Sequence, residues 1–434
     1  MVLRNAFTVA FAAAALVGST AAQATGSREK LCPAETPCCG LYGDCGIGAF
    51  CLGGCDITMS HSFKACVPNP VCKSGTYKLD SLDDVQDIGK YLGDNSKINW
   101  QAQGTPKVYN DGLLLTMSED SSGTLLASTF YVWYGKICAK MTTSQGRGVV
   151  TAFIMMSDVK DEIDFEFIGT DINHVQSNFY SQGVTDYTQT KNLTVSPETV
   201  SKPHEYCLDW KPEELTWSVD GSDMRTVKKS DTWNATANHF AYPQTPSRIM
   251  LSLWPAGKAG NAEGTVNWAG GAIDWHSPYM TSAGYYAAKV DQVTVECYDP
   301  PSGVKKTGNK SYKYTDKAAT NDTVEISNDF VILGSLEDTG ENPGDASKTK
   351  TSTSTSTNSA PQVPGGIIGG GGRQEPTAAP QSTGSSGSSG SSSSDAFDQG
   401  TSGKSAGVAV EPSLHKIGGS AIAIVVTVLG LLVL

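Results

Sequence analysis

Short apolar or alternating runs, separated by turn signals, follow one another between residues 112 and 299. Runs of about four to eight such residues are typical of β-strands. The Asp220-Gly221 pair after one of them is the signal of a tight hairpin. No stretch of twelve or more residues here has a persuasive helical period with caps. The pattern predicts an all-β sandwich of two large antiparallel sheets, with strands in GLLLTMS, TLLASTFYVWYGKICAKMTT, GVVTAFIMMS, EIDFEFIG, LTWSVDG, SRIMLSLWP and KVDQVTVECYD.

One run, DEIDFEFIG at residues 161–169, mixes four carboxylates with large apolar side chains. Side chains alternate between the two faces of a strand, so one face carries Glu162, Asp164 and Glu166. The opposite face carries Ile163, Phe165 and Phe167, and Asp161 falls with them at the start of the strand. We expect the apolar set to pack between the sheets and the acidic set to line an outer surface.

The acidic set has two interpretations, a solvated polar face on an edge strand or a catalytic row. Neighbouring carboxylates repel and raise one another's pKa, so three in a row carry a cost that indicates a function. Retaining glycoside cleavage needs two carboxylates at different pKa values, a nucleophile and a general acid/base about 5 to 5.5 Å apart. Cα atoms four residues apart on a flat strand are separated by about 13 Å. We therefore expect a curved sheet, whose cleft suits a polymer chain.

The N-terminus has the order of a secretory signal peptide: Arg4, the apolar run AFTVAFAAAALVG, then small residues that end at Ala24. We expect residues 1–24 to be removed. A lone N-terminal membrane anchor would look similar, but this run is short for a span of about 20 residues.

The C-terminus has three features in the order of a glycosylphosphatidylinositol (GPI) attachment signal. They are the small residues Ser405-Ala406-Gly407, the polar spacer VAVEPSLHK and the apolar tail IGGSAIAIVVTVLGLLVL. We expect lipid attachment at Ser405, with Ser402 and Gly403 as alternatives, and removal of residues 406–434. The competing interpretation is a C-terminal transmembrane helix.

Composition agrees with an extracellular protein. Eight of the eleven cysteines lie between Cys32 and Cys72, which in a secreted segment indicates disulfides, and the odd total leaves one thiol unless it pairs between molecules. The formal charge of -12 argues against a nucleic-acid partner. The six histidines are scattered without ligand spacing, so we expect neither a metal nor another cofactor. Asn-x-Ser/Thr sequons for N-glycosylation begin at Asn192, Asn234, Asn309 and Asn321.

Tryptophans and low-complexity segments set the domain boundaries. All eight tryptophans lie within residues 73–301, so the packed core belongs there, after a Cys-rich module at residues 25–72. Residues 302–345 form a polar extension without a functional interpretation. Residues 346–405 are rich in Ser, Thr and Gly, and such a segment cannot bury enough apolar surface to offset its ordering entropy. We expect a disordered, O-glycosylated stalk there.

The acidic strand and its surroundings resemble glycoside hydrolase family 16. E-I-D-F-E, reached through YGKICAKMTTSQGRGVVTAFIMMSDVKD, looks like the active-site strand of that family. Further pieces match in HEYCLDWKPEELTWSVDG and MLSLWPAGKAGNAEGTVNWAGGAIDW. Together with the Cys-rich module and the stalk, residues 30–300 resemble the fungal Crh-type cell-wall transglycosylases, which link chitin to β-glucan. The resemblance implies a β-jelly-roll sandwich of two curved sheets.

The resemblance also implies roles by position. Glu162 would be the nucleophile, Asp164 the residue that orients it and tunes its charge, and Glu166 the general acid/base. Water as acceptor would give hydrolysis, and a sugar hydroxyl would give transfer. The choice of transfer depends on the resemblance alone.

Aromatic side chains are expected in the sugar subsites, because pyranose faces stack on rings. The best candidates are Trp254 and Trp268, followed by Tyr180 and Gln176. The competing interpretation for each is a place in the core of the sandwich. Trp210 and Trp217 alternate with apolar strand residues and are assigned to the core.

The Cys-rich stretch CPAETPCCGLYGDCGIGAFC resembles a hevein-type chitin-binding module, which holds N-acetylglucosamine with exposed aromatic residues. This sequence offers Tyr42 and Phe50, but Asp44 and Ile47 lie near its centre and the usual leading cysteine is absent. Chitin binding and a disulfide cap packed on the catalytic domain stay open as alternatives.

Three cysteines lie beyond the module. Cys207 and Cys297 could bridge two strands, which would leave Cys138 as the unpaired thiol. Spacing alone does not fix this connectivity.

Two functional hypotheses of different classes follow. The first is a monomeric, GPI-anchored glycosidase or transglycosylase of the cell wall and the outer face of the plasma membrane. Its partners would be a chitin donor and a β-glucan acceptor, with the lipid as its only membrane contact; hydrolysis of chitin or β-glucan without transfer is the variant of this hypothesis. The second is a wall protein that binds polysaccharide without catalysis. The intact row Glu162, Asp164 and Glu166 favours the enzyme.

Overall fold

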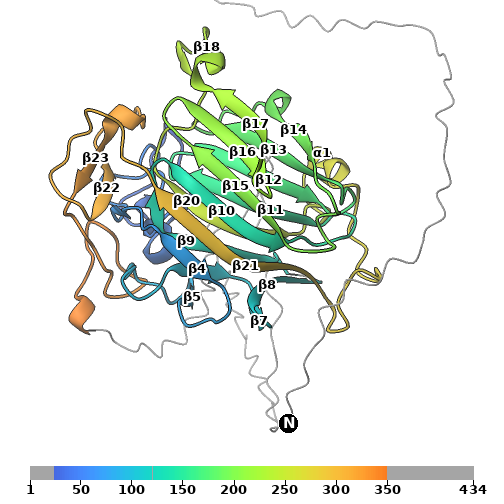
Figure 1. The fold of residues 1–434 in the computed structure, drawn as a ribbon. Coiled ribbons are helices and arrows are strands. Elements are labelled where there is room, and N and C mark those ends of the chain that lie inside the picture. Colours follow the sequence, from blue (N-terminus) through green and yellow to red (C-terminus); the bar gives the residue numbers. More distant parts are fainter. Residues whose placement is uncertain (1–23, 120, 349–434) are drawn as a thin grey trace, which may run out of the picture. The chain divides into compact units, whose positions relative to one another are not determined.

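The computed structural model describes residues 24–119 and 121–348. Within them lie two eight-stranded sheets, three smaller sheets and one short α-helix, α1 (Glu263–Trp268) (Figure 1). Almost all of the expected signal peptide and stalk lies outside these residues, as do the GPI signal and Ser405. Of the helices in the described part of the chain, none combines the length and apolar character needed to cross a membrane.

The first large sheet is antiparallel throughout. Its strands, in hydrogen-bonded order, are β17 (Ser222–Lys228), β16 (Glu214–Val219), β15 (His204–Trp210), β10 (Gly135–Thr142), β21 (Tyr285–Cys297), β8 (Gly112–Ser118) and β7 (Lys107–Tyr109). An eighth strand, β4 (Gly75–Lys78), pairs with the second half of β21. The long β21 therefore borders β10 along one edge and β8 and β4 along the other.

The second large sheet carries the acidic strand near its middle. In order it contains β14 (Lys191–Thr194), β13 (His174–Tyr180), β12 (Glu162–Ile168), β11 (Val150–Ser157), β20 (Ser247–Trp254), β9 (Thr124–Val132), β6 (Trp100–Gln103) and β5 (Val85–Asp87). Only the pair of β5 and β6 is parallel among the pairs of this sheet. All seven predicted runs form strands, and the predicted all-β jelly-roll sandwich is confirmed.

The hairpin signal also proves correct. Asp220 and Gly221 join β16 to β17 with positive φ angles of 49° and 79°, and Val219 pairs with Ser222 across the turn. Both central residues of a type I′ turn need such angles, which match the twist of the flanking strands.

The core lies between the two large sheets and includes the apolar set of β12. Ile163, Phe165 and Phe167 are at most 1% exposed. The ring of Phe167 packs edge to face on Tyr206 of β15, with 4.6 Å between ring centroids. Trp210 and Trp217 are fully buried, as predicted. The Trp217 Nε1–H donates to the carbonyl oxygen of Asp164 at 2.9 Å, so an indole of one sheet supports the backbone of the acidic strand in the other.

The expected bridge between Cys207 and Cys297 is wrong. Cys138 pairs with Cys207, and Cys297 pairs with Cys72. The strand order explains the error, because β10 lies between β15 and β21 and separates two cysteines on them by about 9 to 10 Å. A disulfide needs Cα atoms less than about 7 Å apart. Cys138 and Cys207 are direct neighbours in the β10–β15 register.

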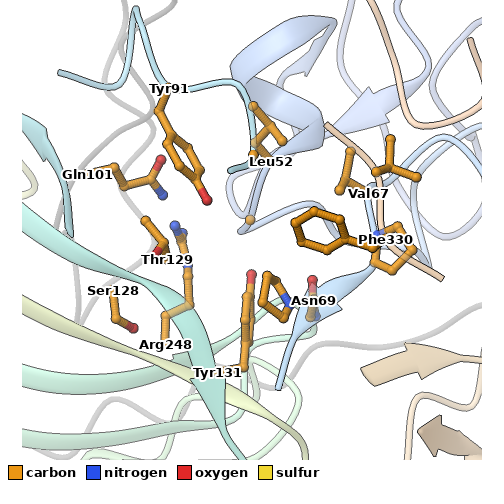
Figure 2. Close-up of a pocket in the computed structure, with 15 residues that line it drawn as sticks. Leu52, Val67, Asn69, Tyr91, Gln101, Ser128, Thr129, Tyr131, Arg248 and Phe330 are labelled. Carbon is orange, nitrogen blue, oxygen red and sulfur yellow. The ribbon is translucent and has the colours of Figure 1, made fainter. Parts of the chain in front are cut away.

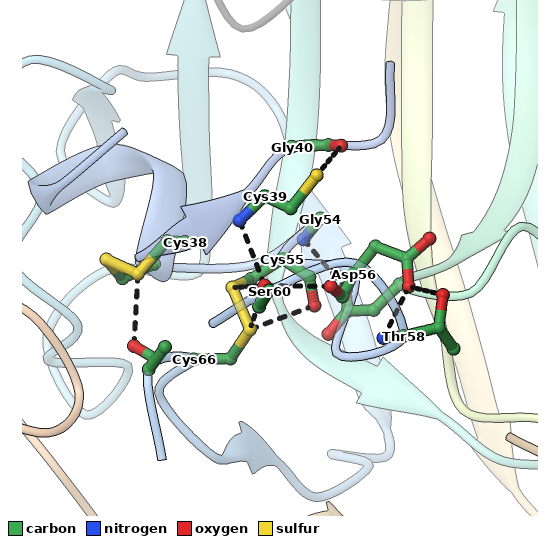
Figure 3. Close-up of a disulfide and its surroundings, with 12 residues drawn as sticks. Cys38, Cys39, Gly40, Gly54, Cys55, Asp56, Thr58, Ser60 and Cys66 are labelled. Atoms are coloured by element: carbon green, nitrogen blue, oxygen red, sulfur yellow. Dashed lines mark hydrogen bonds between the residues drawn. A yellow bond between two sulfur atoms is a disulfide. The ribbon is translucent and has the colours of Figure 1, made fainter. Parts of the chain in front are cut away.

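The Cys-rich module holds three disulfides of its own and three very short strands, of which β1 (Cys38–Cys39) and β2 (Cys45–Gly46) pair with each other. Its disulfides are Cys32–Cys45, Cys38–Cys51 and Cys55–Cys66. Figure 3 shows the third beside Ser60, with the thiol of Cys39 directed toward the carbonyl of Gly40. Cys39 is the free cysteine of the described residues, it is buried, and burial raises its pKa to about 12.

The two aromatic residues offered for chitin binding by this module differ in exposure. Tyr42 is 39% exposed, whereas Phe50 is 4% exposed and lies under Gly46, where a Cβ would meet its ring. Only one of the two rings is therefore accessible to a sugar.

The polar extension is structured and lies against the module. A three-stranded sheet joins β23 (Val324–Ser327), β22 (Ser311–Tyr314) and the module's β3 (Asn69–Pro70). The remaining short elements are β18 (Trp233–Asn234), β19 (His239–Phe240) and the 3-10 turns η1 (Gly48–Cys51), η2 (Tyr187–Gln189), η3 (Lys229–Thr232), η4 (Asn321–Thr323) and η5 (Ala346–Lys348).

Candidate active site

Strand β12 presents three carboxyl groups on the face that points away from the core. The alternation of the strand puts Glu162, Asp164 and Glu166 there, while the intervening apolar residues fill the sandwich. The carboxyl residues are nevertheless 7%, 0% and 6% exposed. The expected row exists, but it is recessed rather than spread on an open surface. We call this face of the second sheet the acidic face.

Each carboxyl residue of the row has a defined neighbour on both sides. Directly paired residues in a sheet point to the same face, and on β13 the partners of the row, in order, are Tyr180, Asn178 and Gln176. On β11 the partners are Met156, Ile154 and Ala152. The row thus has polar side chains on one flank and apolar side chains on the other.

Burial perturbs every acid of the row. It raises the pKa of Glu162 to about 8; the side chain of Asp164 opposes this rise, and the charge of Glu166 adds to it. Burial also holds the pKa of Asp164 and of Glu166 well above the usual range of a carboxyl group. Glu162 Oε1, Glu166 Oε1 and both Asp164 oxygens have no hydrogen-bond partner among the described residues.

The charges of the row also act on one another. The charge of Glu166 raises the pKa of Glu162, that of Glu162 raises the pKa of Asp164, and that of Asp164 raises the pKa of Glu166. The three groups therefore titrate as one interacting set, and the row holds protons at neutral pH that isolated carboxyl groups would have lost. A carboxylate beside a protonated acid is the combination that retaining cleavage uses.

Asp161 has a different role from its neighbours. Its buried carboxylate accepts hydrogen bonds from the backbone N–H of Gln182 at 2.9 Å and of Gln244 at 2.9 Å. Thr245 donates to it from its backbone N–H at 3.0 Å and from Oγ1 at 2.6 Å. Asp161 ties two loops to the start of β12 and lies outside the row, as the alternation predicts.

The candidate sugar contacts gather at the two ends of the row. Trp254 is 3% exposed and stacks on the half-buried Trp268 of α1, with ring centroids 6.1 Å apart. The Trp268 Nε1–H donates to Gln176 Oε1 at 2.9 Å, which brings this indole to the residue opposite Glu166. Tyr180, 5% exposed, lies opposite Glu162 at the other end.

Comparison with known proteins agrees with this geometry. Residues 93–270 match the model of glycosyl hydrolases family 16. Crh-like protein 3 of Botryotinia fuckeliana is 51% identical over 327 residues, which cover 75% of this chain and 73% of that protein. The chain belongs to glycoside hydrolase family 16. Crh-like protein 2 of Aspergillus fumigatus is also 51% identical, over 349 residues that cover 80% of this chain and 79% of that protein.

A solved structure of the same group has the same fold. The structure of a Crh5 transglycosylase in complex with NAG matches with a TM-score of 0.50 at 29% identity and covers 61% of this chain and 97% of that one. The chain is thus a Crh-like family 16 protein. The predicted enzyme class, a glycoside hydrolase of transglycosylase type that acts on carbohydrates, is confirmed.

Sequence reasoning missed one polar neighbour of the row in this family 16 fold. Asn178 lies opposite Asp164, is 3% exposed, and its Oδ1 has no partner in the described residues. The signal was available, because the same period of two that groups Gln176 with Tyr180 places Asn178 between them.

One cluster of the described residues has the spacing of metal ligands, Cys138, Glu205 and Cys207. The two sulfur atoms form a disulfide, and only a thiolate sulfur binds a metal. This cluster of the family 16 fold is therefore a cross-link between β10 and β15.

Proposed function

We propose that this protein is a retaining transglycosylase that cleaves chitin-type β-1,4-linked chains and transfers them to β-glucan in the fungal cell wall. The observation that carries the proposal is the row of three buried carboxyl groups with raised pKa values on β12 of a family 16 fold. The structure of a Crh5 transglycosylase with bound NAG, the N-acetylglucosamine unit of chitin, supports the donor.

The roles in cleavage are those that the positions of the three carboxyl groups in the family motif imply. Glu162 attacks the anomeric carbon in its ionised form, which burial makes the minor form below about pH 8; the glycosidic bond breaks, and the leaving oxygen takes the proton of Glu166. This leaves a glycosyl ester on Glu162 and a carboxylate on Glu166. Asp164, two residues along the same face of β12, is the residue proposed to orient Glu162 and tune its charge.

Transfer reverses these steps with a new acceptor. Glu166 takes the proton of a β-glucan hydroxyl, whose oxygen attacks the anomeric carbon and releases the Glu162 carboxylate. The recessed position of the row supports transfer over hydrolysis, because closed sites exclude the competing water. Trp268 and Trp254 near Glu166, and Tyr180 near Glu162, are the proposed sugar contacts, and Gln176 holds the Trp268 indole.

The ends of the chain complete the proposal from sequence alone. The signal peptide at residues 1–24 directs secretion, and the stalk at residues 346–405 separates the catalytic domain, residues 73–301, from a GPI lipid on Ser405. N-glycans are proposed at the four sequons, of which Asn192, Asn234 and Asn309 are exposed and Asn321 is half-buried.

The test is to incubate the secreted chain with chitin oligosaccharides and a fluorescent β-glucan oligosaccharide and to search for hybrid products. Glu162→Gln should abolish hybrid formation, and Glu198→Gln, an exposed change, should leave it intact. Shorter chitin oligosaccharides without hybrids would mean a hydrolase. No change in either substrate would refute catalysis and favour the polysaccharide-binding alternative.

A second experiment separates nucleophile from acid. Glu162→Ala with sodium azide and an aryl chito-oligosaccharide should form a glycosyl azide, because the small anion takes the place of the missing carboxylate. The donor for this reaction has a leaving group that needs no protonation, so Glu166 is not required. Glu166→Ala, which keeps the nucleophile and still forms the ester, should give an azide product with retained configuration; a retained azide from Glu162→Ala would overturn the assignment.

A further inference from the structure

The acidic face has an apolar patch beside the catalytic row, and one residue of the Cys-rich module covers it. The patch is a cluster of buried residues from β9, β11, β13 and β20: Leu125, Ala127, Ala152, Ile154, Met156, Tyr180 and Met250. The one member of this cluster from outside the sheet is Leu41, which is 5% exposed. A sheet face without a second layer would leave such side chains in water, at a cost of about 25 cal/mol per Å².

Polar contacts fix the module at this place. The buried carboxylate of Asp158, at the end of β11, accepts hydrogen bonds from the Gly54 N–H at 2.7 Å and the Asn69 Nδ2 at 2.8 Å. The hydroxyl of Tyr131 on β9 also donates to it, at 2.7 Å. Burial raises the pKa of Asp158, and the charge of Arg248 and these donors oppose the rise.

The contact between Arg248 and the module depends on two glycines. Gly53 and Gly54 have φ angles of +85° and +67°, and a Cβ on either would come within 2.9 or 3.0 Å of a guanidinium nitrogen. Neither position accepts a side chain, so the backbone lies directly on the arginine. Figure 2 shows the residues that meet here: Leu52, Val67 and Asn69 of the module, Gln101, Tyr131 and Arg248 of the sheet, and Phe330 of the extension.

The module is also held on its other side. Asn69–Pro70 form the edge strand beside β22, and the Gly48 N–H donates to the carbonyl of Asp338 at 2.9 Å. The disulfide Cys72–Cys297 binds the end of the module to β21. With three internal disulfides and anchors on two sides, the module is a fixed part of the catalytic unit rather than a lobe on a tether.

The register gives the distance between this wall and the row. Glu162 pairs with Met156, and Met156 pairs with Arg248, so the arginine under the module lies two strand spacings, about 9 to 10 Å, from the nucleophile. On the opposite flank the face continues over β13 with Gln176, Asn178 and Tyr180. A sugar chain laid across the strands meets the module in one direction only.

We propose that the Cys-rich module ends the sugar-binding face on the β20 side, with Leu41 as the residue that limits how far the chain extends from Glu162. The proposal rests on the proposed function for the identity of the row. Under this proposal the position of the module sets which oligosaccharide lengths the enzyme prefers. The module needs no chitin-binding site of its own for this role.

The test compares Leu41→Ala with Leu41→Met, which keeps the volume, and with Met59→Ala, which removes packing from a cluster inside the module. Product lengths from a chito-oligosaccharide ladder should show a fixed limit on one side of the cleaved bond in the wild type. We expect Leu41→Ala to admit a longer chain there, with at least a threefold change in the ratio of product lengths. Leu41→Met and Met59→Ala should keep the wild-type ratio.

A binding measurement makes the outcome independent of catalysis. In the Glu162→Gln background, calorimetry should show affinity that stops rising beyond a certain oligosaccharide length, and Leu41→Ala should raise that length. An unchanged limit in both measurements, with a lowered unfolding temperature as proof that the Leu41 contact is lost, would overturn the proposal. If Leu41→Ala is not secreted, Leu41→Val is measured in its place. If the wild type forms no product while Leu41→Ala still shifts the binding limit, the proposed function is refuted and this inference is not.

Discussion

The burial of the three carboxyl groups on β12 predicts that replacing the Glu162 carboxyl group by an amide increases the free energy of unfolding. In Glu162→Gln the neutral amide replaces a carboxyl group that the fold keeps protonated, because burial raises its pKa from 4.5 to about 8. Above pH 4.5 the unfolded chain loses this proton and the folded protein does not, so the wild type loses stability as the pH rises, until pH 8 is reached. At about 1.4 kcal/mol per pH unit, the loss at pH 7 is about 3 kcal/mol. The amide variant has no such loss.

Thermal unfolding at several pH values measures this effect. For a domain of this size 1 kcal/mol corresponds to about 2 to 4 °C in Tm, so we expect Glu162→Gln to unfold about 6 to 12 °C above the wild type at pH 7. The difference in Tm should vanish near pH 4, where the Glu162 carboxyl group is protonated in both the folded and the unfolded wild type. Glu198→Gln, an exposed control, should change Tm by no more than about 2 °C at any pH. A difference in Tm that stays constant with pH, or a variant less stable at pH 7, would refute the reasoning.

Three further predictions test other contacts. Replacing Cys72 and Cys297 by Ser should cost about 5 kcal/mol in urea unfolding, because their disulfide closes a loop of 225 residues; an unchanged midpoint would contradict this. Trp268→Ala should raise KM for chitin oligosaccharides about threefold to tenfold with little change in kcat, since a ring contact contributes about 0.5 to 1.5 kcal/mol. Peptide mass spectrometry should find a glycan on the exposed Asn192 more often than on the half-buried Asn321, and equal occupancy would argue against control by exposure.

The sequence predicts what depends on local alternation and misses what depends on strand order. The period of two in EIDFEF is enough to separate the row from the core set, and the structure has the same separation. The disulfide of Cys207 cannot be read in this way, because its partner is decided by the strand that lies next to β15 in space. Nothing near Cys207 in the chain carries that information.

Burial of the row is another property that its own strand does not encode. A carboxylate face on an isolated sheet would be solvated, whereas here elements far away in the chain pack on the neighbours of Glu162 and Glu166, which are 7% and 6% exposed. Leu41 precedes the row by more than a hundred residues, and α1 follows it by about as many. Such contacts have no periodic signature. For the same reason the module reads as a separate unit in the sequence, although it packs on the acidic face.

Burial of the row lowers the stability of the folded protein, and it also affects whether water or a sugar acts as acceptor. With the row at most 7% exposed, the glycosyl ester proposed on Glu162 would lie in a site that admits little water until the departing sugar leaves. Leu41 closes the face on the β20 side, so this space opens toward β13 and Trp268. A bound sugar hydroxyl that fills it has the advantage of proximity over a diffusing water molecule. Raised pKa values and lost stability are therefore the expected consequence of a site that transfers rather than hydrolyses.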